Sequence, residues 1–106
     1  MALRVRRADV PEGRGVDARF AAWGLRPRSW TNTPGSRFEW HDHQEHKVLY
    51  CVGGSITFHG RDGLDIELHP GDRLDVEADT EHSATVGPDG VECTEAFAPR
   101  PPEDSS

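Results

Sequence analysis

The residues of this chain best suited to chemistry are its six histidines, at positions 41, 43, 46, 59, 69 and 82. His41 and His43 stand two residues apart in an alternating segment, 37–43, that is predicted to be a β-strand. Because strand side chains alternate, both imidazoles leave the same face. A divalent metal suits two neutral imidazoles held this close; the alternative is a solvated strand face with two exposed histidines.

Several other residues are predicted, from their strand parity, to face the same pocket as His41 and His43. Glu39 has the strand parity of His41 and His43, so it is the first candidate for an inward carboxylate, and Glu45 in the following loop is the second. Leu49 and Cys51 have the parity of Lys47 and are predicted to line the same pocket. The remaining histidines, at turn edges, are predicted to lie on the surface: His46, His59 and His69.

The elements that must position these residues are short strands. After residue 28, turn residues divide the chain into apolar or alternating runs: 28–33, 37–43, 47–52, 55–59, 64–68, 73–76, 81–86 and 91–97. Such spacing predicts an antiparallel all-β sandwich or barrel, and no helical pattern separates the runs as a parallel α/β sheet would need. Before them, Val16, Phe20 and Trp23 recur at helical spacing ahead of Gly24, which predicts a short amino-terminal helix.

Length and patterning favour a single domain of 106 residues. We expect an arm and short helix over residues 1–27, a barrel over 28–97 and a disordered acidic tail over 98–106. Cys51 and Cys93 lack the spacing of a redox or zinc motif and are predicted to be buried core residues.

Charge and hydropathy exclude some classes of partner. The formal net charge of -7 argues against nucleic acid, which needs a basic face. The sequence has no run of about 18 apolar residues, the length that a membrane-spanning helix requires. The first residues lack the apolar core of a secretory signal, so the expected location is cytoplasmic.

Two stretches of the sequence resemble the motifs of the cupin superfamily. The first motif, G-x5-H-x-H-x3-4-E-x6-G, is matched in spacing by Gly35, His41, His43, Lys47 and Gly54. The second, G-x5-P-x-G-x2-H-x3-N, is matched in spacing from Gly71 to Val86, with its histidine at His82. The resemblance covers roughly residues 28–97 and implies an antiparallel jelly-roll barrel, in which His41, His43 and His82 converge on one metal ion.

The sequence departs from these motifs at several positions. Glu77 and Asp79 replace the proline and glycine of the second motif, and Val86 replaces its asparagine. Lys47 stands where the family's glutamate ligand would be. Three roles for Lys47 are open: a buried lysine paired with Glu39, a positive charge for an anionic substrate such as a carboxylate, or a catalytic general base or Schiff-base nucleophile.

The resemblance and the three histidines together predict a small metal-dependent enzyme that acts on a small oxygenated molecule, with zinc, iron, manganese or nickel as cofactor. The alternative is a non-enzymatic small-molecule binding or sensor domain, including a metal-free form in which Lys47 replaces the metal charge. Val48, Tyr50 and Val52 make the strand over 47–52 apolar on both faces, so its outer face must pack on the amino-terminal arm or on a second subunit. We therefore predict a homodimer.

Overall fold

The computed structural model describes residues 2–11, 14–99 and 102. Within them the chain forms one short helix, α1 (Val16–Ala22), and seven strands. The strands are β1 (Leu3–Arg6), β2 (Arg28–Asn32), β3 (Arg37–His41), β4 (His46–Gly60), β5 (Asp65–Leu68), β6 (Arg73–Val76) and β7 (His82–Ala98). The all-β prediction with a short amino-terminal helix is therefore confirmed. The predicted acidic tail falls mostly outside the described residues.

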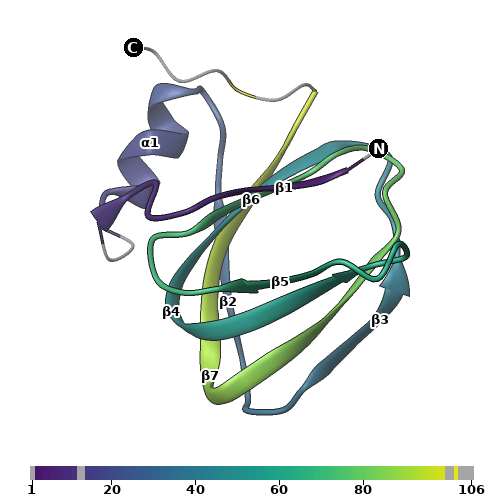
Figure 1. Cartoon of the computed structure of the whole chain (residues 1–106). Helices are drawn as coiled ribbons and strands as arrows, with labels where there is room; N and C mark the ends of the chain where they lie inside the picture. Colours follow the sequence, from purple (N-terminus) through teal and green to yellow (C-terminus); the bar gives the residue numbers. More distant parts are fainter. Residues whose placement is uncertain (1, 12–13, 100–101, 103–106) are drawn as a thin grey trace.

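All strand pairs are antiparallel, and the two longest strands hold the fold together. The order β1-β6-β4-β7-β2 forms one path, while β3 pairs with β7 and β5 pairs with β4 off this path. The first half of β4 pairs with β6 and its second half with β5. The first half of β7 likewise pairs with β3 and its second half with β2. Figure 1 shows how the curvature of these two strands wraps the sheet into a barrel-like shape.

Turns that the sequence suggested within β4 and β7 are bends of continuous strands. The expected breaks at Gly53-Gly54 and at 87–90 lie inside β4 and β7. The pairing register shifts between Cys51 and Gly53 and again between Gly54 and Ile56, as it does at β-bulges. Each pair of predicted strands is thus one long strand that bends and contributes to both sides of the barrel.

The main hydrophobic core fills the inside of the barrel. It contains buried side chains from both halves of β4 and β7 and from β5 and β6: Leu49, Cys51, Ile56, Phe58, Ile66, Leu68, Leu74, Val76, Ala84, Val86, Val91 and Cys93. Cys51 and Cys93 are direct cross-strand partners, both fully buried and both free thiols, as predicted for core residues. The barrel interior is therefore apolar except at one end.

A second, smaller core lies on the outer face of β4, under α1. Val48 and Tyr50 point away from the barrel interior and pack with Val16 and Phe20 of the helix. The ring of Phe20 meets those of Tyr50 and Trp23 edge to face, with centroids 5.7 Å apart in each pair. The amino-terminal segment thus covers the apolar outer face of β4 within one chain. The homodimer stays a prediction.

The helix ends where the sequence predicted. Gly24 adopts a positive φ of 73°, and the N–H groups of Gly24 and Leu25 donate to the carbonyls of Ala21 and Phe20. This is a Schellman C-cap, which needs the left-handed conformation that glycine adopts without strain.

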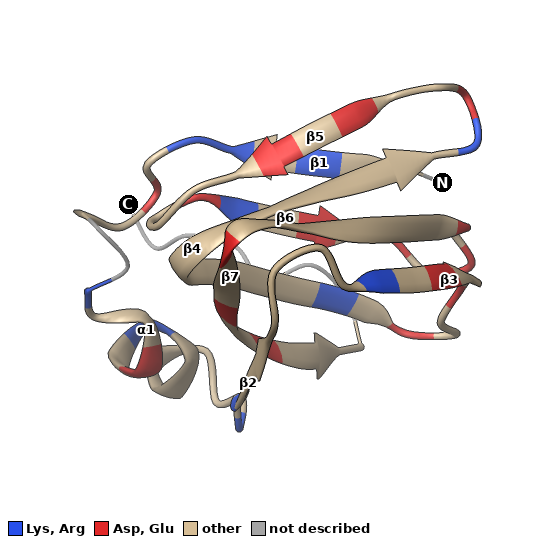
Figure 2. Ribbon diagram, turned by 90° about the horizontal axis from the view of Figure 1, so that it is seen from below, with Lys and Arg blue, Asp and Glu red and all other residues tan. Residues whose placement is uncertain are grey.

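The charged side chains are spread over the fold. Figure 2 shows Lys and Arg scattered among acidic residues over several strands. Among the described residues, no helix has the length and apolar character that a membrane span requires.

Candidate metal centre

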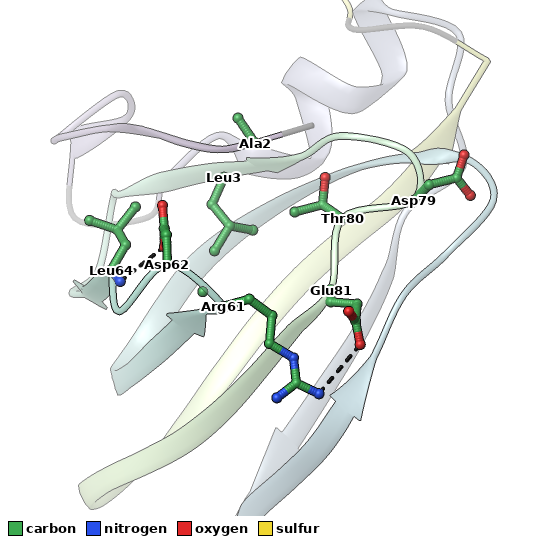
Figure 3. Close-up of a pocket in the computed structure, with 9 residues that line it drawn as sticks. Ala2, Leu3, Arg61, Asp62, Leu64, Asp79, Thr80 and Glu81 are labelled. Carbon is green, nitrogen blue, oxygen red and sulfur yellow. Dashed lines mark hydrogen bonds and ion pairs between the residues drawn. The ribbon is translucent and has the colours of Figure 1, made fainter.

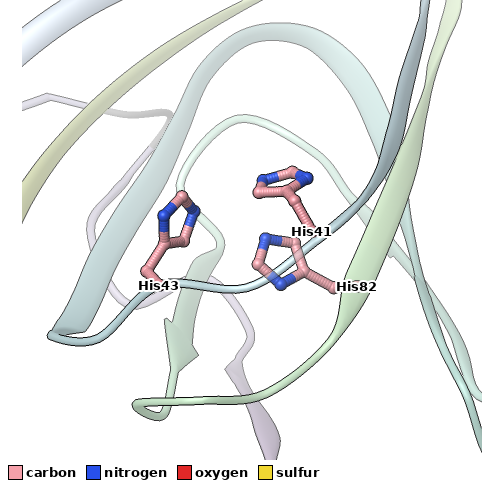
Figure 4. A group of neighbouring side chains, drawn as sticks. All are labelled: His41, His43 and His82. Atoms are coloured by element: carbon pink, nitrogen blue, oxygen red, sulfur yellow. The ribbon is translucent and has the colours of Figure 1, made fainter.

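The three histidines of the two motifs meet at one end of the barrel. His41, the last residue of β3, and His82, the first of β7, are direct cross-strand partners. His43 lies in the loop between β3 and β4. The ring centroids are 4.3 Å apart for His41 and His82, 4.8 Å for His41 and His43, and 5.4 Å for His43 and His82. Figure 4 shows the three rings grouped around one point.

Backbone carbonyls fix the orientation of two of these rings. Nδ1 of His41 lies 2.6 Å from the carbonyl oxygen of Glu39, and Nδ1 of His82 lies 2.9 Å from that of Thr80. A carbonyl can only accept, so each Nδ1 carries the proton and donates it. In the neutral ring the lone pair then lies on Nε2, which is the arrangement of metal-ligating histidines supported by a backbone acceptor.

Burial keeps the inner imidazoles in the neutral form. His82 is 1% exposed, and burial lowers its pKa below the ordinary value. Burial lowers the pKa of His43 to about 4, and the nearby Lys47 ammonium acts in the same direction. At neutral pH the imidazoles of His43 and His82 are therefore uncharged, as metal ligation requires.

The residues present fit a metal ion. One ligand atom from each histidine lies within 4.8 Å of the others, which makes the three a cluster that could hold a metal ion. Nitrogens bound to zinc at about 2.1 Å in tetrahedral geometry lie roughly 3.4 Å apart, so modest ring rotations would close the site. Nε2 of His43 and Nε2 of His82 are buried without a hydrogen-bond partner. Buried polar atoms are rarely left this way, and a bound cation would satisfy both.

A small cavity lies beside two of the histidines. Its volume is about 40 Å³, enough for a few water-sized groups. Most of its wall is apolar, and its polar side chains come from the site: the cavity is lined by Trp30, Phe38, His41, Lys47, Leu49, Ile56, Phe58, His82 and Ala84. A ligand group next to the histidines would thus contact mostly apolar side chains.

Lys47 is buried near this cavity but does not pair with Glu39. Its side chain is 9% exposed, and Nζ lies 3.5 Å from Oε1 of Glu95. The same oxygen accepts a hydrogen bond of 2.8 Å from Nε1 of Trp30. Nζ also lies 5.7 Å from the ring centroid of Phe97, in cation–π range. The predicted pairing of Lys47 with Glu39 is wrong, and the inward carboxylate is Glu95.

The reason for the error is a β-bulge in β3. Phe38 pairs with Ala84 and His41 with His82, so three steps on β3 face two steps on β7. The extra residue breaks the inward–outward alternation of side chains along β3. Phe38 and His41 therefore both border the cavity, although three positions separate them. Glu39 is exposed and contacts the site through its backbone carbonyl alone, not through its carboxylate.

The structure places the other predicted residues in different layers. Leu49 lines the small cavity, whereas Cys51 lies deeper in the core and does not border it. His46 is not a surface residue: it is 5% exposed, and its Nε2 lies 2.8 Å from Oδ2 of Asp75. Asp75 also accepts two hydrogen bonds from the buried Arg73 guanidinium. His46 shares the face of Val48 and Tyr50, outside the barrel, and so lies apart from the metal cluster.

Two larger grooves lie on the outside of the barrel. One, of about 320 Å³, lies between β1, the β4–β5 turn and the segment before β7, with an ion pair between Arg61 and Glu81 beside it (Figure 3). The other, of about 530 Å³, lies over β3, β7 and β4. There the His59 ring bridges Asp65 and Thr85, at 2.7 and 3.0 Å. Neither groove follows from a motif or a residue pattern of the sequence.

Fold and site together define a cupin, and the chain belongs to this family. The family model described as a cupin domain matches residues 29–93, which include the three histidines, Lys47 and Cys93. No curated protein matches the sequence. The family assignment therefore rests on the domain match and on the solved structures similar to it.

Several solved structures have the same fold as this chain. A chain from the crystal structures of the DMSP lyases RdDddP and RnDddQII is 27% identical, with a TM-score of 0.64, over 69% of this chain and 37% of that chain. An RmlC-like cupin from Shewanella frigidimarina NCIMB 400 is 26% identical, with a TM-score of 0.62, over 72% of this chain and 67% of that one. A DUF861 family protein from Thermotoga maritima matches in fold at 10% identity, with a TM-score of 0.66, over 92% of this chain and 100% of that chain. The chain thus spans little more than a third of the lyase structure.

Proposed function

We propose that this cupin domain binds one divalent metal ion through His41, His43 and His82 and is a metal-dependent enzyme for a small oxygenated molecule. The observation that carries the proposal is the pair of buried, unpartnered Nε2 atoms on His43 and His82. Beside them lies His41, whose Nδ1 donates to a backbone carbonyl as that of His82 does. Zinc, iron, manganese and nickel all accept imidazole ligands.

Each group around the centre has a part in this function. A metal bound there would act as a Lewis acid toward an oxygen atom of the substrate. The carbonyls of Glu39 and Thr80 hold two imidazoles in place, and the apolar side chains of Trp30, Phe38 and Phe58 exclude water from the cavity. The similarity to a DMSP lyase chain supports an enzyme of this fold class, but it covers only part of that protein.

A non-enzymatic binding domain is the second candidate. The small cavity supports it, because only a few water-sized groups fit beside the histidines. A metal-free variant, with Lys47 in place of the metal charge, has less support, since Glu95 already balances the Lys47 charge. A ligand that raises the melting temperature without being converted would favour the binding domain.

Calorimetric titration of chelator-treated protein with Zn²⁺, Mn²⁺, Ni²⁺ and, without oxygen, Fe²⁺ tests the metal site. We expect close to one ion per chain for at least one metal. His82→Ala and His41→Ala should each lose more affinity than the about 10- to 100-fold that loss of a supporting partner costs. The exposed His69 provides the control, and His69→Ala should bind as the wild type does. Equal affinity in all four proteins would refute the proposal.

A further inference from the structure

Lys47 and two of the metal-binding histidines line the same small cavity. His41, His82 and Lys47 supply its ionisable side chains, and the other lining residues are apolar or aromatic. Nε1 of Trp30 donates to Glu95, the ion-pair partner of Lys47, and Glu95 is not among the residues that line the cavity. Lys47 therefore borders the space next to the histidines, whereas its partner carboxylate does not.

The ion pair leaves hydrogen-bonding capacity on Lys47. Its Nζ lies 3.5 Å from Glu95, longer than the about 2.7–2.9 Å of a strong charge-assisted hydrogen bond. An ammonium group has three N–H donors, and one loose contact does not use them all. A polar group inside the cavity can thus accept a hydrogen bond from Nζ without displacing Glu95.

The charge balance of the site favours an anionic ligand. An imidazole that ligates a metal ion is in its neutral form and contributes no charge, and Lys47 and Glu95 cancel each other. Among the described residues, the cluster that could hold a metal ion contains no carboxylate, and Asp42 acts on His82 only as a nearby charge. A divalent cation on the histidines would therefore bring a charge of +2 that no protein ligand neutralises, beside a mostly apolar cavity wall. A glutamate at position 47, as in the family motif, would lower the net charge of the site by two, because an anion would replace the Lys47 cation.

We propose that Lys47 and the metal centre form a carboxylate-binding subsite, so that the protein takes small carboxylate-bearing molecules. The inference rests on the proposed metal site and adds the substrate class. One carboxylate oxygen would lie toward the three imidazoles that would hold the metal, and the other would accept a hydrogen bond from Nζ of Lys47. A carboxylate has three heavy atoms, which suits a cavity of about 40 Å³, while the rest of the molecule extends toward the open end of the barrel.

The test uses protein loaded with Co²⁺, whose visible absorption reports changes in its ligands. Acetate and acetamide are the probes, because they match in size and differ in charge. We expect acetate to change the spectrum at concentrations at least tenfold lower than acetamide. Lys47→Met should weaken acetate binding tenfold or more, while Arg28→Met, which removes an exposed cation on β2, should leave it unchanged.

A double variant separates the hydrogen bond from the net charge. Lys47→Met with Glu95→Gln removes both charges of the pair, which keeps the net charge and avoids an unpaired buried Glu95. It should also bind acetate at least tenfold more weakly than the wild type. Wild-type affinity in the double variant, or equal binding of acetate and acetamide, would overturn the carboxylate subsite alone. Failure of Co²⁺ to bind would overturn the metal site and, with it, this inference.

Discussion

The N–H group of Asp79 donates a hydrogen bond of 2.7 Å to the carbonyl oxygen of His43. This contact joins the segment before β7 to the loop after β3, and so joins the two motifs that supply the histidines. Asp79 adopts a positive φ of 61°, which non-glycine residues rarely do. The family motif has glycine at this position, and the backbone conformation explains why.

We expect the conformation of Asp79 to govern which substitutions are tolerated there. Asp79→Gly should be as stable as the wild type within about 1 kcal/mol, since glycine adopts positive φ without strain. Asp79→Ala should be less stable than Asp79→Gly by about 1 kcal/mol, because alanine cannot make the local hydrogen bonds that let aspartate tolerate this conformation. Urea denaturation of the two variants measures the difference, and an alanine variant more stable than the glycine variant would contradict it.

Gly54, the last glycine of the first motif, is predicted to be intolerant of any side chain. It has a φ of 66°, and a Cβ atom there would lie 2.0 Å from the carbonyl oxygen of Gly90. Gly54→Ala should cost at least about 3 kcal/mol of unfolding free energy, because the two strands must separate. Gly63 has a φ of 83° with open space around it, so Gly63→Ala should cost only about 1 kcal/mol. Thermal denaturation of both variants should show this order, and the reverse would refute it.

Much of the site could be predicted because the spacing of the motif residues along the chain determines where their side chains lie in the fold. The two-residue spacing of His41 and His43 and the position of His82 after Gly71 led to the cluster that the structure shows. The apolar runs also predicted the strands, since a residue's burial depends mainly on which face it occupies. Glycines at Gly53-Gly54 indicated bends correctly but were mistaken for chain reversals, because both features need the same backbone freedom.

The errors arose where a local pattern does not determine the tertiary contact. Strand parity placed Glu39 inside, but the bulge before His41 reverses that assignment, and no residue type marks it. Glu95 was overlooked because it belongs to neither motif. Its alternation with Cys93 on β7 was a usable signal, since Cys93 lies in the inner core. The same alternation with Val48 and Tyr50 would have shown that His46 is buried.

Asp72 should make stability depend on pH in the acidic range. Burial would raise its pKa, but hydrogen bonds from the backbone of Ala8 and His69 and from Arg7 outweigh burial, so the pKa is lowered. A lowered folded-state pKa stabilises the fold above the unfolded value of about 3.9, and this stabilisation is lost as the pH falls through the folded value.

Asp72→Asn should therefore cost about 2 kcal/mol at pH 7, and the gap to the wild type should narrow steadily below about pH 4. Urea denaturation at pH 7, 5 and 3 measures the gap. Asp65→Asn is a useful control, because the Asp65 side chain is 65% exposed and its replacement should have little effect. A gap that stays constant with pH would contradict the assignment to Asp72.

Glu95 and Lys47 should depend on each other for stability. Glu95→Gln leaves a buried ammonium without its counter-ion and should cost about 3 kcal/mol. Adding Lys47→Met should recover most of that loss, because the pair as a whole adds little net stability. A double-mutant cycle by chemical denaturation measures the coupling, and strictly additive effects would show that the two side chains do not interact.

The long bent strands β4 and β7 have a consequence for how the domain comes apart. Each belongs to both halves of the barrel, and β4 also carries the outer layer beneath α1. Because β4 and β7 run through both halves of the barrel, neither half can fold alone without leaving backbone N–H and C=O groups of these strands unpaired. Thermal unfolding followed by different probes should accordingly give coincident curves, because the end of the barrel that carries the histidines and the side covered by α1 unfold together.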